Sequence, residues 1–212
     1  MRNALNAHRW DKFLLFGILF SLAGLGLAAF LAPAERTLGL NIRLVYFHGA
    51  WVWAGLILFL LAALAGLAGL ALRRAGVQRA SLMLGRTALL YWLTYLPMSL
   101  LVMQVTWGGF FFSEPRWRIP LMIAVAETVL QIALVLLDSL PLAAGANLLF
   151  GVGIWAVLLP AGSVLHPDSP VFGSGSVSIQ VRFVLMVSLA LAAGLLLAAW
   201  LWRRRSKSRE AG

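Results

Sequence analysis

The chain of 212 residues contains no cysteine and few charged residues, which make up 11% of the sequence. Without cysteine, a disulfide-rich secreted scaffold, a thiol–disulfide enzyme, a cysteine zinc site and an iron–sulfur protein are all excluded. Soluble domains average roughly a quarter charged residues, about twice this content. Because 62% of the residues are apolar, the composition also excludes an ordinary soluble domain and a disordered chain. It predicts a polytopic helical membrane protein.

Acidic residues are scarce as well, with 7 Asp and Glu against 17 Lys and Arg, for a net charge of +10. A basic protein of this kind could bind nucleic acid, but that function needs a basic patch on a soluble domain. Here the basic residues stand at the ends of long apolar runs, where membrane proteins carry them. The sequence therefore predicts the lipid bilayer as a partner and no nucleic acid.

Six apolar runs are long enough to cross a membrane, because a transmembrane helix needs about 20 residues. The whole chain, 1–212, is thus predicted to be one all-α integral membrane domain with a basic cytoplasmic tail. The first run also resembles a signal peptide, but it is longer than the usual signal core of about 7–15 residues. We place the spans at residues 13–33, 44–72, 87–106, 119–137, 142–165 and 183–202, and the tail at 203–212.

Six spans place both termini on one side, and the basic residues indicate which side it is. Lys and Arg favour the cytoplasmic side, so we expect both termini to be cytoplasmic and the membrane to be the cytoplasmic (inner) one. The terminal side holds Arg2, Arg9, Lys12, Arg73, Arg74, Arg79, Arg86, Arg203, Arg204, Arg205, Lys207 and Arg209. The external, periplasmic side holds only Arg36, Arg43, Arg116, Arg118 and Arg182.

Two histidines, His48 and His166, lie at the predicted external ends of the second and fifth spans. Heme iron accepts axial histidines, and its flat apolar macrocycle suits an aromatic pocket at a membrane edge. No cluster of Asp, Glu, His or Cys in the sequence supplies the further ligands that another metal site needs. Trp51, three residues after His48, would line such a pocket. The alternative is a pair of amphipathic interfacial histidines that bind nothing.

The predicted external segment from Trp107 to Arg118 reads WGGFFFSEPRWR. Gly108 and Gly109 allow a close approach of the backbone, and residues 110–112 are all phenylalanine. This composition is typical of an amphipathic segment on the membrane surface, which would give a planar ligand an aromatic floor. The alternative is an ordinary aromatic belt at the headgroup level. Arginine binds carboxylates with two hydrogen bonds, so the candidates to hold heme propionates are Arg116, Arg118, Arg43 and Arg182.

Glu127 interrupts the fourth span, with Gln131 one helical turn later. Intramembrane acids are costly and usually face the bundle interior or a cavity. One interpretation is a proton or ligand-polarising site, which would make the chain a small-molecule transporter or channel subunit. The other is a glutamic acid whose hydrogen bonds join helices. The sequence has no GxxxxGK[ST], GxSxG or HExxH motif, so we do not expect catalysis by this chain alone.

The aromatic segment resembles the cytochrome c assembly family of heme-handling membrane proteins, which includes the heme exporter protein C type. The external tryptophan-rich loop of that family reads roughly WGxYWxWDP[KR]. The matching positions are Trp107, Gly108, Pro115 and Arg116. The departures are Phe110 for Tyr, Phe111 for Trp, Ser113 for the next Trp and Glu114 for Asp.

The resemblance covers roughly residues 43–182, and it includes an external histidine on either side of the loop, matched by His48 and His166. It implies a protein of c-type cytochrome biogenesis that holds b-type heme transiently between these axial histidines, over the aromatic loop. It also implies partners, namely ATP-driven exporter subunits and a heme chaperone or cytochrome c heme ligase. The departures leave a second hypothesis, a non-catalytic membrane scaffold with a vestigial loop.

Overall fold

The computed structural model describes residues 2–34, 38–162, 164–165 and 171–210, with only the backbone given for residues 2–8, 174 and 205–210. Within these residues every regular element is helical. Six helices are long and apolar enough to cross a membrane, which confirms the predicted all-α architecture with six spans. The elements are α1 (Arg2–Phe30), α2 (Ile42–Ala71), α3 (Ala75–Trp107), α4 (Pro115–Leu137), α5 (Leu140–Leu158), the short 3₁₀ helix η1 (Phe172–Ser174) and α6 (Val177–Glu210).

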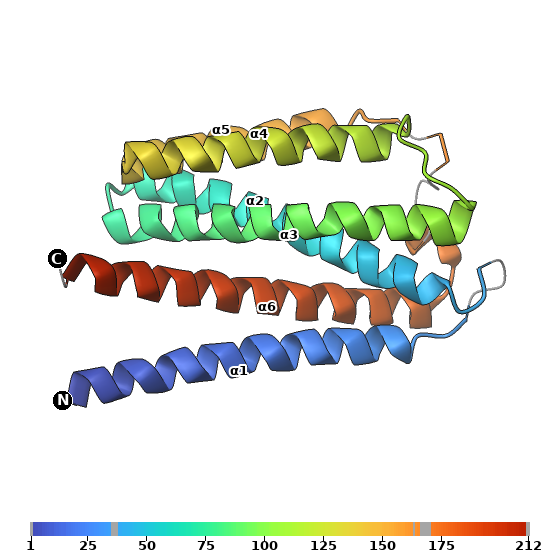
Figure 1. Cartoon of the computed structure of the whole chain (residues 1–212), viewed down its shortest axis with the longest axis horizontal. Helices are drawn as coiled ribbons and strands as arrows, with labels where there is room; N and C mark the ends of the chain where they lie inside the picture. The colour runs from blue at the N-terminus through green and yellow to red at the C-terminus, as the bar shows by residue number, and fades with distance from the viewer. Residues whose placement is uncertain (1, 35–37, 163, 166–170, 211–212) are drawn as a thin grey trace.

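The six long helices run roughly along one axis, and both ends of the chain lie at the same end of the bundle (Figure 1). We call this end the terminal end. It also carries the α2–α3 and α4–α5 connections. The opposite end, here the loop end, carries the three connections that the sequence analysis assigned to the external side. The structure thus separates the two predicted sides, while their assignment to cytoplasm and periplasm stays a prediction.

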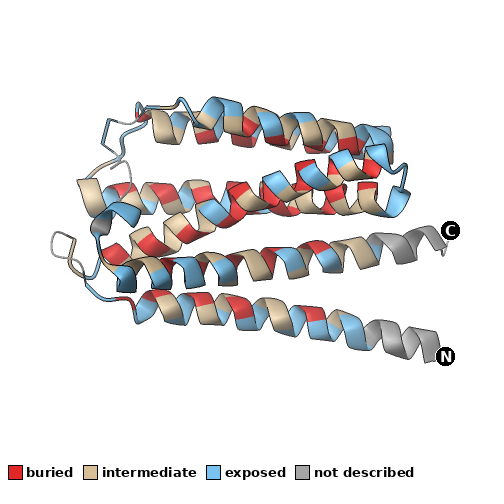
Figure 2. Cartoon of the chain, turned by 180° about the vertical axis from the view of Figure 1, so that it is seen from behind, coloured by how far each residue is buried: buried red, intermediate tan, exposed pale blue. Residues whose placement is uncertain are grey.

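Helix α6 lies between α1 and the remaining helices, and α2 packs against α3, α5 and α6 (Figure 1). Buried residues concentrate on the inward sides of the helices, and exposed ones cover the outside (Figure 2). Many of the exposed side chains are large and apolar, including Leu136, Leu149 and Met122. Water would not tolerate so extensive an apolar surface on a monomer, so this outer surface is suited to lipid.

Glycines let α5 approach α2 and α3 closely. A Cβ atom added to Gly66 of α2 would collide with the backbone oxygen of Ala144 in α5. A Cβ atom on Gly85 of α3 would lie 2.9 Å from both the nitrogen and the oxygen of the Asn147 side-chain amide. In a membrane, such contacts between small residues supply much of the helix–helix attraction, because burial of apolar side chains from lipid gains little.

One tyrosine and one tryptophan of α3 form hydrogen bonds to neighbouring helices. The Tyr91 hydroxyl donates a hydrogen bond to the Ala190 oxygen of α6 at 2.7 Å. The Trp92 indole donates to the Pro120 oxygen of α4 at 2.9 Å. Both rings are buried, so each places an apolar body in the core and pairs its one polar atom with backbone.

The predicted helix limits need corrections at α3, α5 and α6. Helix α3 begins at Ala75 rather than at residue 87, because the helix extends beyond the uncharged run and includes Arg79 and Arg86. Helix α5 ends at Leu158 rather than at residue 165, because Pro160 lacks an N–H group and disfavours helix at the residue before it. Helix α6 begins at Val177 rather than at residue 183. The predicted span starts after Arg182 and ends before the tail at 203–212, whereas α6 includes Arg182 and continues to Glu210. A helix can continue past the hydrocarbon core with charged residues at its ends.

Candidate functional site

His48 lies in the second turn of α2, at the loop end of the bundle, and its side chain is half-buried. Its ring contacts the ring of Tyr95 in α3, with centroids 5.2 Å apart and planes inclined by 35°. The imidazole is therefore held between two helices at the edge of the core. It neither projects freely into lipid nor lies in the centre of the bundle.

Trp51 follows His48 by one helical turn, and its ring is held by stacking and by hydrogen bonds. The indole stacks on Tyr91 at 4.1 Å and on Phe47 at 6.0 Å between centroids. Its Nε1 donates hydrogen bonds to the Thr94 hydroxyl at 2.9 Å and to the Tyr91 backbone oxygen at 3.2 Å. The stack makes a rigid aromatic wall beside His48, built from α2 and α3.

Tyr95 connects this wall to the first turn of α4, which directly follows the aromatic loop. Its hydroxyl donates a hydrogen bond to the backbone oxygen of Arg116 at 3.2 Å. That oxygen needs an outside donor, because the residue four positions on is Pro120, which has no N–H to offer in the helix. The sequence analysis missed Tyr95, although its spacing of four from Tyr91 places both on one face of α3.

The aromatic loop, residues 108–114, is irregular and forms no helix of its own. Gly108 ends α3 in the left-handed conformation, with φ of 72°, which is the usual role of glycine after a helix. The position of the loop between α3 and α4 agrees with the prediction, but an amphipathic segment on the membrane surface is not confirmed.

The phenylalanines of the loop are exposed and associate with each other and with the flanking tryptophans. Phe110 and Phe112 stack with centroids 6.1 Å apart, while Phe112 meets Trp117 edge to face at 5.1 Å. Trp107 and Phe111 form another edge-to-face pair at 5.9 Å. A Cβ atom on Gly109 would make only an ordinary contact with the Phe111 ring, at 3.7 Å, so the structure shows no close approach that requires glycine there. The result is an apolar aromatic surface at the loop end.

Glu114 is the one acid of the loop, and it is almost fully buried, with 3% of its surface exposed. It stands directly before Pro115, the first residue of α4, but its carboxylate does not cap that helix. Instead the carboxylate accepts hydrogen bonds from the backbone N–H groups of Val164, at 3.2 and 3.3 Å, and Leu165, at 3.0 Å. The aromatic loop is therefore joined to the segment that follows α5.

The second predicted ligand, His166, follows Leu165 directly but lies outside the described residues. Its pairing with His48 therefore stays a prediction. Within the described part of the chain, no three His, Cys, Asp or Glu side chains gather closely enough to hold a metal ion.

The predicted arginine candidates divide into two groups. Arg43 donates to the Ala32 oxygen at 3.0 Å, and Arg182 donates to the Leu31 oxygen at 3.3 Å. Both therefore bind carbonyl groups just beyond the end of α1, a favourable place for cations. Arg116 is half-buried and Arg118 is exposed, both in the first turn of α4 beside the aromatic loop.

Glu127 and Gln131 belong to a separate buried network deeper in the bundle. Gln131 donates to Glu127 Oε1 at 2.8 Å and to Asn147 Oδ1 in α5 at 3.4 Å. Asn147 donates in turn to the backbone oxygen and hydroxyl of Ser81 in α3, at 2.9 and 3.2 Å. The Ser81 hydroxyl then donates to the Ala62 oxygen of α2 at 2.8 Å.

This chain of hydrogen bonds joins α4, α5, α3 and α2, which agrees with the interpretation of Glu127 as a helix-joining acid. Asn147 and Ser81 were missed from sequence, although each is a polar residue within an apolar stretch. Two oxygen atoms of this network have no hydrogen-bond partner among the described residues. They are Glu127 Oε2 and Gln131 Oε1. Those two atoms are what a proton or ligand site would use.

No protein family matches this sequence, and neither a curated protein nor a solved structure is significantly similar to it.

Proposed function

We propose that this protein binds heme at the loop end of the bundle and handles it during the biogenesis of c-type cytochromes. The observation that carries the proposal is the bond of Glu114 to the backbone of Val164 and Leu165. It joins the loop that resembles the heme-handling motif to the segment leading into His166. Tyr95, which contacts His48, binds the Arg116 oxygen in the turn of α4 that directly follows this loop.

The described residues at the loop end carry chemical groups that complement those of a heme. Heme would present an iron that accepts axial imidazole, a flat apolar ring and two carboxylates. His48 offers an imidazole at the edge of the core, and the phenylalanines at 110–112 offer exposed apolar rings. Arg118 offers an exposed guanidinium beside them. Each part of the ligand thus has a matching group at the same end of the protein.

The protein's own contribution in this proposal is to hold these groups in fixed places. Stacking and two hydrogen bonds orient Trp51, so the wall beside His48 needs no rearrangement when a ligand arrives. Buried Glu114 fixes the relative position of two loops that are 50 residues apart in the chain. A preorganised site of this kind lowers the entropic cost of binding.

Heme would be cargo in this proposal, passed on by the partners that the resemblance implies. These are ATP-driven exporter subunits and a heme chaperone or cytochrome c heme ligase. The chain has no energy-coupling motif of its own, so release of heme would depend on such a partner. The proposed location is the cytoplasmic membrane, with the loop end facing outward.

The test is a heme titration of the purified protein in detergent, followed by visible absorption. We expect a Soret band of bis-histidine character in the wild type. His48→Ala and His166→Ala should each give the spectrum of a single axial imidazole, and the double variant should bind at least tenfold more weakly. His8→Ala is the matched control, because His8 lies in α1 at the terminal end, and it should leave the spectrum unchanged.

Two results would overturn the proposal. One is a folded wild-type protein that fails to bind added heme. The other is a Soret band that survives in the double variant. Free imidazole should convert the single-imidazole spectrum of a His48→Gly variant back to one of bis-imidazole character, which distinguishes a lost ligand from a misfolded protein.

A further inference from the structure

A groove opens at the terminal end of the bundle, far from the loop end. It lies between α1, α3 and α6, is open to the outside and has a volume of about 550 Å³. Helix α6 lies between the other two helices in this region (Figure 1), so it forms the floor and they form the walls. The lining residues are Trp10 and Leu14 of α1, Gly76, Val77, Ala80 and Leu84 of α3, and Leu195, Ala198, Ala199, Trp202 and Arg203 of α6.

The polarity of the groove changes along its length. Its deep part is lined by Leu14, Leu84 and Leu195, and small residues such as Ala198 and Ala199 leave the floor open. Its mouth carries two tryptophans and Arg203. Tryptophan favours the level of the lipid headgroups and arginine the level of the phosphates. The groove therefore has the same order of polarity as a phospholipid molecule.

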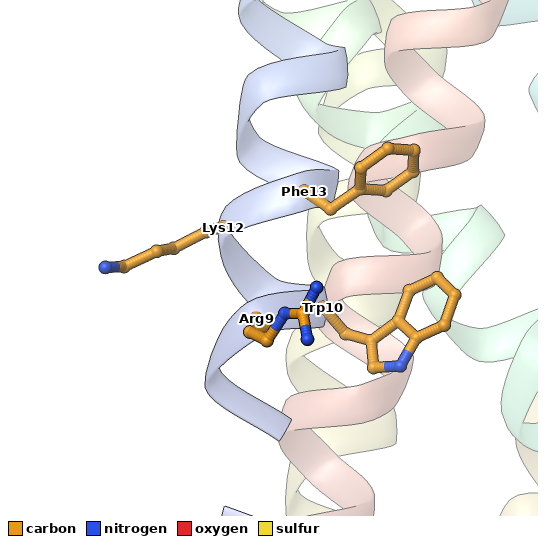
Figure 3. A pocket seen from close by; sticks show the side chains of 4 residues that line it. All are labelled: Arg9, Trp10, Lys12 and Phe13. Atoms are coloured by element: carbon orange, nitrogen blue, oxygen red, sulfur yellow. The ribbon is translucent and has the colours of Figure 1, made fainter. Parts of the chain in front are cut away.

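The walls of the mouth are held in place. Trp202 donates a hydrogen bond from Nε1 to the Gly76 oxygen at 3.2 Å, which joins α6 to the start of α3. Arg203 lies over the Trp10 ring, 5.9 Å from its centroid, and its Nε is 3.6 Å from Asp11 Oδ1. Figure 3 shows Trp10 and Phe13 projecting from α1 on the side of α6, while Lys12 points away from the bundle.

Charge at the mouth is positive. Arg9 lines a second hollow that adjoins the groove at Trp10. Arg9 and Arg203 contribute two positive charges here, and Asp11 offsets only one of them. Gly76 is the second residue of α3, so the positive end of that helix dipole adds to the field. An anionic headgroup therefore meets a complementary surface at this place.

The length of the groove distinguishes a lipid from a partner helix. Its lining runs from residue 76 to 84 on α3 and from 195 to 203 on α6, or about 12 Å along each helix. One leaflet of the hydrocarbon core is about 15 Å thick, whereas a transmembrane helix would need contact over about 30 Å. We propose that the groove between α1, α3 and α6 binds one anionic phospholipid from the leaflet at the terminal end.

The test is native mass spectrometry of the full chain in mild detergent, with phosphatidylglycerol and phosphatidylcholine of identical acyl chains. We expect the wild type to retain one phosphatidylglycerol molecule with a preference of about fivefold, the effect of one basic side chain near a headgroup. Arg203→Gln should abolish the preference. Arg204→Gln is its matched control, because Arg204 lies over Trp200 outside the groove, and it should keep the preference.

A second pair of variants tests the apolar part of the groove. Ala199→Leu should expel both lipids, because the larger side chain fills the floor. Ala126→Leu adds the same atoms at an exposed position of α4 and should expel neither. Equal retention of the two lipids by the wild type would overturn the proposal. So would an equal effect of the two arginine variants, or a small membrane polypeptide that copurifies and is lost in Ala199→Leu.

Discussion

Two buried glutamates, Glu114 directly before α4 and Glu127 within it, are similar in burial but bind different kinds of partner. They are 3% and 1% exposed, and they lie about 20 Å apart along the helix axis. Glu114, in the aromatic loop, accepts hydrogen bonds from backbone N–H groups of a loop distant in the chain. Glu127 bonds to Gln131 one turn along its own helix, and only through that amide to α5.

The difference shows what a buried acid can do at each depth. Near a helix end, loops supply backbone N–H groups that no secondary structure uses, so a carboxylate can organise a surface site. In mid-span, the N–H groups of neighbouring helices are already paired, so side-chain amides and hydroxyls must serve. The contacts of Glu114 therefore organise the candidate site, whereas those of Glu127 join helices inside the bundle.

The largest effect should follow from breaking the deep network at its centre. Asn147→Leu removes the partner of both Gln131 and Ser81, and the larger side chain presses on Gly85. We expect the free energy of unfolding in detergent to fall by about 2–3 kcal/mol. Val152→Leu, on the exposed side of α5, is the control and should change it by less than about 0.5 kcal/mol. Equal effects of the two variants would show that the network contributes nothing.

Breaking the bond made by Glu114 should instead have a local effect. Glu114→Gln replaces one acceptor oxygen by a donor and removes the negative charge. The backbone N–H groups of Val164 and Leu165 therefore keep only one uncharged acceptor between them. We expect their hydrogen exchange to accelerate about tenfold, while exchange around Asn147 stays unchanged. Asp138→Asn, a carboxylate exposed at the other end of α4, is the control. Acceleration throughout the protein would contradict a local role.

Much of the fold follows from the sequence, because a span is encoded in the length of an apolar run. The six spans and the common end of the termini are confirmed for that reason. The end of α5 was not anticipated, because the apolar run continues past Pro160 while the backbone cannot stay helical there. A local backbone constraint overrode the composition.

The candidate site is harder to predict from sequence, because the hydrogen bonds that hold it together join residues far apart in the chain. Glu114 stood out as a motif position, yet nothing in its neighbourhood indicates Val164 as its partner. Tyr95 is one aromatic residue among many in an apolar helix, and it acquires a role only because Pro120 leaves the Arg116 oxygen without a donor. Such pairings depend on tertiary structure, which periodicity does not report.

The smallest effect on stability should come from a conservative substitution of Glu127. This substitution distinguishes a residue that only joins helices from one whose carboxyl group takes part in the function. Glu127→Gln keeps an acceptor oxygen for Gln131, so we expect the free energy of unfolding to stay within about 0.5 kcal/mol of the wild type. Glu127→Leu removes that acceptor and should cost about 1–2 kcal/mol. Neither change should alter heme binding at the loop end.

The same pair of variants tests the transporter hypothesis for Glu127. A proton or ligand site depends on the carboxyl group itself, so Glu127→Gln would then abolish activity while leaving stability intact. The measurement is the yield of c-type cytochrome in cells that depend on this chain, beside unfolding of the purified variants. One outcome is that the cytochrome yield follows protein stability, so that Glu127→Gln is close to wild type and Glu127→Leu is impaired. Glu127 then serves to join helices. If the stable Gln variant has no yield, then Glu127 Oε2 and Gln131 Oε1, which have no hydrogen-bond partner within the described part of the chain, mark a second functional site in the bundle.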